Sequence, residues 1–372
     1  MKKKQYLCEK FRNEKNRNME NPFKFGAIVE GNYFTDRVQE VAYIKQYIES
    51  PNHLILISPR RFGKSSLVQK ALRESGRTYL SLNLQHAVST QDLAANLLKE
   101  VFKIHPLEQI RHFFTHFRII PTISTNPITG SIDVSFLPNV DASVALEDVM
   151  NLLDKVSDDG ERLVVVLDEF QEILDIAPHL DKQLRAIMQQ QQHINYILLG
   201  SQESMMTDIF ENKKSPFYHF GELMRLKKLP YEEFEQYLSS RLTTCAPDAA
   251  DRLAKQILEY TQCHPYYGQQ LAAEIWQLAM LGTAQENLFE AALNHIVETH
   301  NLDYERLWQN FTRTSKWILI RLAMQQPLQT GEYRTSTIYS ALKKLQKDGY
   351  VNYSTRYEIE DPYFQYYIQH II

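Results

Sequence analysis

Short apolar runs alternate with amphipathic segments from Asn21 to about Leu226. Continuous apolar runs of this length are typical of parallel strands that helices cover on both faces. Such runs occupy residues 53–57, 78–84, 163–167 and 196–199. Apolar residues at helical spacing between them predict helices over 64–74, 93–102 and 145–156. The pattern predicts an α/β domain with a parallel sheet over residues 20–226. Residues 104–140 hold several prolines and no clear period, so we expect an insertion that ends in a hairpin.

The pattern changes twice in the rest of the chain. Residues 227–300 repeat apolar positions at spacings of three and four, which predicts a helical domain. In residues 301–372 we expect helices over 316–324 and 335–348, followed by short strands over 350–354 and 356–359. Ile338, Leu342 and Leu345 share one face of the second helix. Helix, helix and hairpin in this order are typical of a winged helix-turn-helix.

Composition narrows the class of protein. The 372 residues suffice for two or three domains, and scarce Gly and Pro exclude collagen-like and low-complexity chains. A net charge of −4 argues against a wholly basic nucleic-acid coat. Three widely spaced cysteines support neither a disulfide framework nor a zinc cluster. Without an apolar run of about 18 residues or a signal-peptide core, we expect a soluble, cytoplasmic protein with no membrane contact.

Residues 1–19 form a separate, basic segment. They carry seven Lys/Arg and two Asp/Glu, and few apolar residues. We expect a disordered tail, because so little apolar surface cannot offset the entropy of ordering. Met19 opens the sequence that has the pattern of a folded chain, so translation starting at Met19 is an alternative to Met1.

A phosphate-binding loop is the strongest chemical signal. Gly63-Lys64-Ser65 follows the first apolar run and opens the next helix, the strand–loop–helix context of a P-loop. Backbone N–H groups and the helix N-terminus would hold anionic oxygens, with Lys64 on the β- and γ-phosphates and Ser65 on magnesium. Ser58 stands where the pattern has its first glycine, and a positive φ there would strain it. The expected nucleotide contacts here are Ser58, Pro59, Arg60, Arg61, Phe62, Gly63, Lys64, Ser65 and Ser66.

Two further strand ends carry polar side chains. Asp168 and Glu169 end the run 163–167 at the carboxyl edge of the sheet, where ligands of open α/β folds bind. Asp168 would hold Mg²⁺ through water and Glu169 would polarise the attacking water as general base; the alternative is two solvated acids at a strand end. Ser201 and Gln202 follow the run 196–199 and would contact the γ-phosphate or the lytic water, unless they only cap a turn. ATP is the expected nucleotide, since no guanine-reading Asn-Lys-x-Asp motif occurs.

With these motifs in place, residues 21–372 resemble the archaeal-type P-loop ATPases of the AAA+/STAND superclass, a group also found in bacteria. Asn21-Pro22-Phe23 and Phe34-Thr35-Asp36-Arg37 resemble the family's N-terminal box, which implies that Phe34 and Arg37 lie near the base. Leu184-Arg185 resembles the family's helix between the acidic and sensor strands. His264-Pro265-Tyr266-Tyr267 resembles its lid motif, which implies that His264 and Pro265 face the nucleotide. Asp361-Pro362-Tyr363-Phe364 resembles its winged-helix ending.

The resemblance implies an ATP-dependent switch made of a P-loop domain, a helical lid and a winged helix. Relatives often carry Gly-Arg before the strand that enters the lid, whereas Glu222 follows Gly221 here. An arginine finger at that position is therefore in doubt. The candidates are Arg225, Arg185 and Arg61, each of which a surface or ion-pair role explains as well.

Residues 301–372 carry nine Lys/Arg and seven Asp/Glu, a modest basic excess. Candidate phosphate contacts for double-stranded DNA are Arg334, Lys343, Lys344, Lys347 and Arg356. Tyrosines in the same region suit a protein contact equally well. Three functions stay open: a nucleotide-controlled switch that acts on a protein partner or on its own assembly into oligomers, an ATP-dependent DNA-binding protein of the replication-initiator or mobile-element type, and a nucleotide-binding scaffold without turnover.

Overall fold

The computed structural model describes residues 20–35, 37–126, 128, 130, 132–157, 161–353 and 356–372. Their contacts define two units. The α/β unit holds residues 37–60 and 64–227, and the helical unit holds residues 20–35, 61–63 and 228–372. The predicted basic tail, Met19 and Asp36 lie outside the described residues.

The α/β unit is built on one parallel sheet, as the apolar runs predict. Its strand order is β2-β5-β6-β1-β7. The strands are β1 (Leu54–Ile57), β2 (Tyr79–Asn83), β5 (Leu163–Asp168), β6 (Ile194–Gly200) and β7 (Glu222–Arg225). The edge strand β7 is missing from the sequence prediction because its four residues are all partly or largely exposed and form no apolar run.

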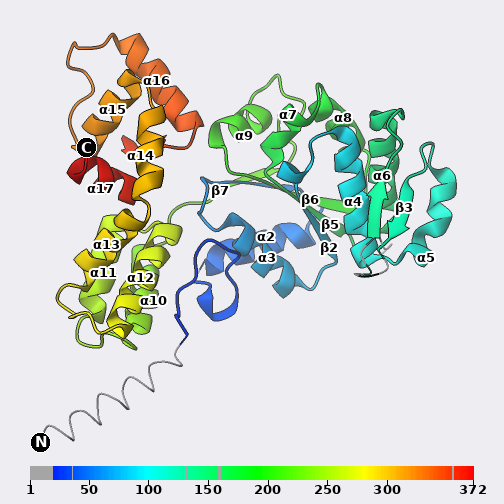
Figure 1. Ribbon diagram of the computed structural model, residues 1–372. Coiled ribbons are helices and arrows are strands. Elements are labelled where there is room, and N and C mark those ends of the chain that lie inside the picture. Colours follow the sequence, from blue (N-terminus) through cyan, green and yellow to red (C-terminus); the bar gives the residue numbers. More distant parts are fainter. Residues whose placement is uncertain are drawn as a thin grey trace, which may run out of the picture. The chain divides into compact units, whose positions relative to one another are not determined.

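Helices cover both faces of this sheet (Figure 1). They are α2 (Val38–Glu49), α3 (Lys64–Ser75), α4 (Thr90–Ile104), α6 (Ala142–Val156), α7 (Ile173–Ile176), α8 (Leu180–Met188) and α9 (Glu203–Phe210). Side chains of α4, α6 and α8 share one core with alternate residues of the strands, such as Leu163 and Val165. The helices predicted over 64–74, 93–102 and 145–156 are thereby confirmed.

The predicted insertion holds short helical turns and a hairpin. Residues 104–140 contain α5 (Leu107–Ile110), the 3-10 helix η3 (Arg111–His116) and the antiparallel strands β3 (Thr122–Thr125) and β4 (Ile132–Ser135). Val134 is buried in the core that includes α4, and Lys99 of α4 pairs with Asp133 over 2.7 Å. The hairpin is confirmed, and these contacts attach it to the α/β unit.

The helical unit begins with residues 20–35 and four helices. These are α10 (Tyr231–Leu242), α11 (Ala250–Thr261), α12 (Pro265–Met280) and α13 (Leu288–Thr299), and they confirm the helical content predicted for residues 227–300. Asn21 donates to the backbone oxygen of Ala273, and Phe23 is buried in the same core. The 3-10 helix η1 (Gly31–Tyr33) is joined to α10 by Tyr237, whose hydroxyl donates to the Tyr33 carbonyl over 3.0 Å.

Residues 313–359 show the predicted order of helix, helix and hairpin, and the helices α14 and α17 on either side of them were not predicted. The elements are α14 (Asn301–Asn310), α15 (Arg313–Ala323), α16 (Thr335–Lys347), β8 (Val351–Tyr353), β9 (Tyr357–Ile359) and α17 (Pro362–His370). Ile338, Leu342 and Leu345 are buried, as their spacing predicts. One hydrophobic core joins these elements to α10–α13, so the packing does not divide the helical unit at residue 300. The winged-helix assignment and the predicted boundary at residue 300 stay predictions.

Two proline motifs are helix starts. The Nδ1 atom of His264 accepts from the backbone N–H of Tyr266 over 3.2 Å, with Pro265 at the first helical turn of α12. Asp361 caps α17 in the same way, with Pro362 following it. Proline suits this position because its missing N–H would have had no helical partner. No helix in the described part of the chain is long and apolar enough to cross a membrane.

Candidate nucleotide site

The P-loop leaves β1 and enters α3, as predicted. Ser58 is fully buried, and its backbone N–H donates to the carbonyl of Gly200 over 3.2 Å. It is not among the described residues with positive φ, whereas Arg61 (67°) and Gly63 (84°) are. Serine at the first position of the motif is therefore unstrained, and the positive φ that favours glycine falls on Gly63.

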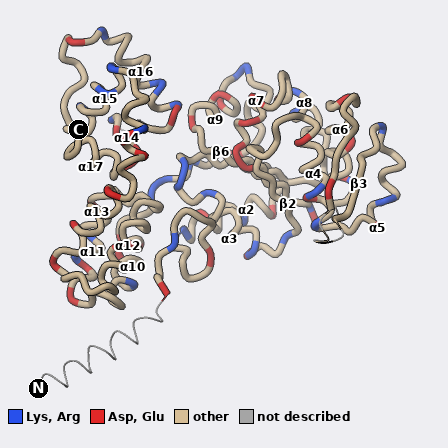
Figure 2. The backbone as a smooth tube through the Cα atoms, viewed as in Figure 1, with Lys and Arg blue, Asp and Glu red and all other residues tan. Residues whose placement is uncertain are grey.

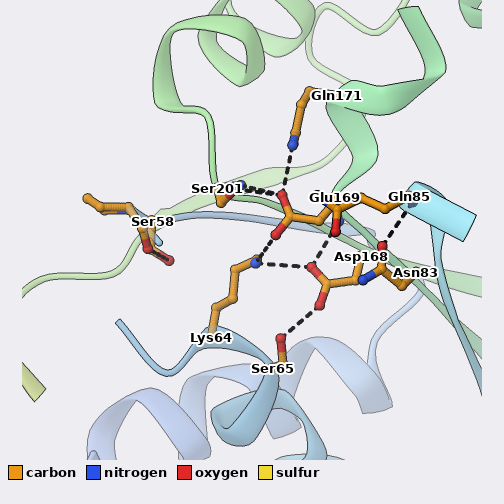
Figure 3. A network of polar contacts seen from close by, with 10 residues as sticks. Ser58, Lys64, Ser65, Asn83, Gln85, Asp168, Glu169, Gln171 and Ser201 are labelled. Carbon is orange, nitrogen blue, oxygen red and sulfur yellow. Dashed lines mark hydrogen bonds and ion pairs between the residues drawn. The ribbon is translucent and has the colours of Figure 1, made fainter. Parts of the chain in front are cut away.

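Lys64 lies between the two acids at the end of β5. Its Nζ is 2.7 Å from Oε1 of Glu169 and 3.2 Å from Oδ1 of Asp168 (Figure 3). Lys64 and Glu169 are both buried. Parallel pairing explains why Lys64, which follows β1, contacts the acids at the end of β5, because the carboxyl ends of parallel strands lie at one edge of the sheet. Lys64, Asp168 and Glu169, predicted from separate motifs, are brought together.

Ser65 and Asp168 form an oxygen pair. The Ser65 hydroxyl donates to Oδ2 of Asp168 over 2.7 Å. Hydroxyl and carboxylate oxygens are ligands that Mg²⁺ accepts, and it usually takes only a few from protein and the rest from phosphates and water. The described residues contain no cluster of three or more His, Cys, Asp or Glu side chains suited to a metal. The pair thus fits a magnesium ion held together with a nucleotide.

Glu169 sits in a turn of strained geometry. Its φ is 55°, a left-handed conformation that few non-glycine residues adopt, and its backbone N–H donates to Oδ1 of Asp168. Burial would raise the pKa of its carboxyl. The charge of Lys64 and hydrogen bonds from Lys64, Ser201 and Gln171 outweigh burial and lower the pKa below its ordinary value. Glu169 is thus held as a carboxylate.

Ser201 lies where the sequence predicts, and Gln171 is a residue that sequence reasoning missed. The Ser201 hydroxyl donates to Oε2 of Glu169 over 2.6 Å. Gln171, two residues after Glu169, donates to the same oxygen over 2.7 Å. Gln202 instead precedes α9, where its carbonyl accepts from Met206. The sequence does not distinguish Gln171 from its polar neighbour Glu172, because the contact with Glu169 depends on the turn that follows Glu169.

Arg37 and Phe34, which the resemblance predicts near the nucleotide base, belong to different units. Arg37 belongs to the α/β unit, where it is buried, pairs with Glu40 and donates to the Lys227 carbonyl over 2.9 Å. Phe34 directly follows η1, as its C-cap, in the helical unit. Ser66 is buried on α3, whereas Arg60 is exposed and Pro59 is partly buried. The roles of these residues in nucleotide binding stay predictions.

Loop residues 61–63 belong to the helical unit by their contacts. The guanidinium of Arg61 lies 4.5 Å from the ring centre of Tyr266, and the Phe62 ring packs edge-on against His264 at 4.8 Å. Burial lowers the pKa of His264 although Glu360, 3.3 Å from its Nε2, acts in the opposite direction. His264 is therefore neutral near pH 7, and its sensing role stays a prediction.

The other two arginine-finger candidates have partners within the α/β unit. Arg225 pairs with Glu211 over 2.7 Å. Arg185 donates to the carbonyl of Pro216 over 3.1 Å and lies over the Phe220 ring. Because both guanidinium groups are engaged, their contacts are those of structural arginines. A finger role for either one, or for Arg61, stays a prediction.

The candidate DNA contacts lie on α16 and the hairpin. Lys and Arg line α16 in Figure 2, and Lys343, Lys344 and Lys347 are exposed opposite its buried face. Arg334 is exposed at the N-terminus of α16. Arg356 is exposed and pairs with Glu358 over 2.8 Å. These side chains are accessible, as phosphate contacts require.

A match to a protein-family model shows which family this chain belongs to. Residues 34–267 match the model of an ATPase domain found predominantly in Archaea. The chain belongs to this family. The match spans the P-loop, the acidic pair and β6, and it ends at Tyr267, the last residue of the motif His264-Pro265-Tyr266-Tyr267. The protein is thus an ATPase that binds nucleotide, as the sequence predicts. No curated protein matches the sequence.

Solved structures show the same fold at low sequence identity. The Walker-type ATPase PABY2304 of Pyrococcus abyssi aligns with a TM-score of 0.67 at 17% identity, over 93% of this chain and 99% of that one. The Aeropyrum pernix ORC2 protein, solved in ADPNP–ADP complexes, aligns with a TM-score of 0.56 at 14% identity, over 94% and 98%. The predicted P-loop fold class is confirmed.

Proposed function

We propose that this ATPase is a switch in which Glu169 promotes hydrolysis and the bound nucleotide controls the helical unit. The observation that carries the proposal is the network at the sheet edge, where Lys64, Ser65, Asp168, Glu169 and Ser201 meet within hydrogen-bond distance. A lysine and a helix N-terminus suit phosphates, and a carboxylate suits a water molecule.

In the proposed reaction Lys64 contacts the β- and γ-phosphates, and Ser65 and Asp168 hold Mg²⁺. Magnesium, when bound, neutralises charge on the phosphate oxygens. Glu169 accepts a proton from water. The water oxygen bonds to the γ-phosphorus while the bond from that phosphorus to the bridging oxygen breaks, and the electron pair leaves with ADP. Each protein group in this scheme lies at one edge of the sheet.

The test compares Glu169→Gln with Asp175→Asn, an exposed carboxylate on the nearby helix α7. We expect Glu169→Gln to bind ATP and to lower kcat about 100-fold or more, since general bases contribute about 100- to 10,000-fold. Asp175→Asn should keep normal turnover. Normal turnover in Glu169→Gln would remove Glu169 from the reaction. Loss of ATP binding in Lys64→Ala would support the phosphate contact.

The switch itself is tested by hydrogen exchange of the full chain with ATP and with ADP, each bound to Glu169→Gln. We expect amides of α10–α17 to differ in protection between the two nucleotides. Equal protection throughout residues 228–372 would leave an ATPase without a switch. Light scattering of the same samples reports whether ATP also drives the assembly of oligomers.

ATP-dependent binding of double-stranded DNA is the second candidate function, in which the bound nucleotide would control the affinity of the helical unit for DNA. It is supported by the three lysines exposed on α16. The Aeropyrum pernix ORC1 protein was solved in complex with DNA, and it aligns with a TM-score of 0.50 at 12% identity over 94% of this chain and 97% of that one. Duplex affinity of the full chain with ATP and ADP, measured at two salt concentrations, tests this candidate.

A further inference from the structure

The two carboxylate oxygens of Glu169 have unequal surroundings (Figure 3). Oε2 accepts from Nε2 of Gln171 over 2.7 Å and from the hydroxyl and backbone N–H of Ser201 over 2.6 and 3.3 Å. Oε1 accepts from Lys64 over 2.7 Å. A carboxylate oxygen offers about two lone-pair sites, so Oε2 has no capacity for another donor.

Gln171 is built into this site. It is fully buried, and its Oε1 finds no hydrogen-bond partner among the described residues. A buried amide oxygen without a partner is costly, and functional sites are where such costs are tolerated. The opposite amide orientation would aim an oxygen at the carboxylate of Glu169 and repel it. The observed orientation keeps the donor on Glu169.

The backbone around Gln171 is fixed on both sides. Glu169, in its left-handed conformation, caps the 3-10 helix η4 (Phe170–Glu172), and its carbonyl accepts from Glu172 over 3.0 Å. Phe170 is fully buried, and its ring packs against those of Phe210 and Phe217. The turn therefore presents the Gln171 side chain from an anchored segment.

We propose that Gln171 is a positioning residue for Glu169. Together with Ser201 it holds Oε2, so that Oε1 is the oxygen that takes the proton of the attacking water. Gln171 touches neither nucleotide nor water in this scheme and acts only through Glu169. The inference rests on the proposed function, in which Glu169 is the general base.

The experiment uses Gln171→Met, which keeps an unbranched side chain and removes the donor. We expect kcat to fall about tenfold to 100-fold while the Kd for ATP changes less than about twofold. A residue that only supports the fold would not lower kcat while leaving the Kd for ATP unchanged.

The matched control is Gln183→Met. Gln183 also donates one 2.7 Å hydrogen bond through Nε2, to the Ser143 carbonyl, and it has no contact with Glu169. It should keep a normal kcat. In a Glu169→Gln background, Gln171→Met should add no further loss of turnover, because residues that act as one unit are non-additive.

Two outcomes separate this inference from the proposed function. If Glu169→Gln is inactive while Gln171→Met keeps the normal kcat, the inference is overturned and the function stands. If Glu169→Gln turns over normally, both fail. Should Gln171→Met not fold, Gln171→Leu, which also lacks the donor, replaces it. A normal kcat in that variant overturns the inference.

Discussion

Nζ of Lys64 lies 2.7 Å from Oε1 of Glu169, and this pair joins the P-loop to the end of β5. Lys64 also lies 3.2 Å from Asp168. One cation therefore faces two carboxylates that are largely shielded from water. The arrangement links the stability of the α/β unit to the same residues that the proposed function uses.

We predict that Lys64→Met lowers the free energy of unfolding by about 2 kcal/mol. Removing one partner of a fully buried pair costs about 3–5 kcal/mol, and partial exposure reduces that figure. Adding Glu169→Gln should recover part of the loss, because it removes one of the unpaired negative charges. Urea unfolding of the two single variants and the double variant measures this coupling. Equal stability of Lys64→Met and the parent protein would contradict it.

The P-loop gives a second prediction, on its missing glycine. Ser58→Gly restores the usual motif, yet Ser58 does not have positive φ, so we expect the Kd for ATP to change less than about twofold. Gly63→Ser places a side chain at a φ of 84° and should weaken ATP binding about tenfold or more. Nucleotide titrations of both variants compare the positions directly. Tighter binding by Ser58→Gly would show that the serine impairs the loop.

His53 directly precedes β1, and its burial leads us to predict how the free energy of unfolding depends on pH. Its ring stacks on Phe220 at 4.5 Å, and its Nδ1 accepts from the Tyr196 backbone. Burial, followed by the charges of Arg185 and Arg162, lowers its pKa from 6.5 to about 4. The unfolded chain therefore binds the proton first as pH falls. The contribution of neutral His53 to the free energy of unfolding is therefore complete above about pH 6.5 and is lost as the pH falls toward 4.

The slope of that decline from His53 is at most about 1.4 kcal/mol per pH unit. Denaturant unfolding of the parent protein and of His53→Asn between pH 7.5 and 4.5 isolates the contribution of His53 to this slope. The variant will be less stable at neutral pH, and its stability should fall less steeply between pH 6.5 and 4.5. Parallel curves would show that His53 does not contribute to the pH dependence.

The sequence predicts the sheet and the charged site well because both depend on local patterns. Four strands are apolar-rich runs, and three of them, β1, β5 and β6, end in a motif whose chemistry is recognisable, such as Asp168-Glu169. Parallel pairing then brings these ends together without further information. The prediction of one site from three separate strand ends follows from this topology.

Other parts of the site depend on tertiary packing and leave no local signal. Gln171 contacts Glu169 only because η4 turns the chain back at a left-handed residue. The strand β7 lies at an edge, where half-exposed residues suffice. The helix α17 is rich in tyrosine, and Tyr363 is buried by contacts with residues distant in sequence, such as Tyr260 and Tyr267. Spacing within one segment cannot reveal such contacts.

The last prediction concerns the lysines on α16. If the helical unit binds double-stranded DNA through this helix, replacing Lys343, Lys344 and Lys347 by glutamine should weaken binding about equally for all sequences. The three side chains are exposed, so the fold should be unaffected. Each lost phosphate contact lowers the slope of log affinity against log salt by about 0.9, so the slope should fall by about one to three.

The matched control replaces Lys213 and Lys214, which are exposed in the α/β unit. Both proteins are titrated with a fluorescent duplex at 50, 100 and 200 mM salt, with ATP bound. A reduced slope in the α16 variant alone identifies this helix as the phosphate-contacting element, because non-specific attraction to any surface lysine would affect both variants. Equal slopes would exclude α16 as the source of the affinity. Absence of duplex binding by the parent protein would instead favour the switch that acts on a protein partner.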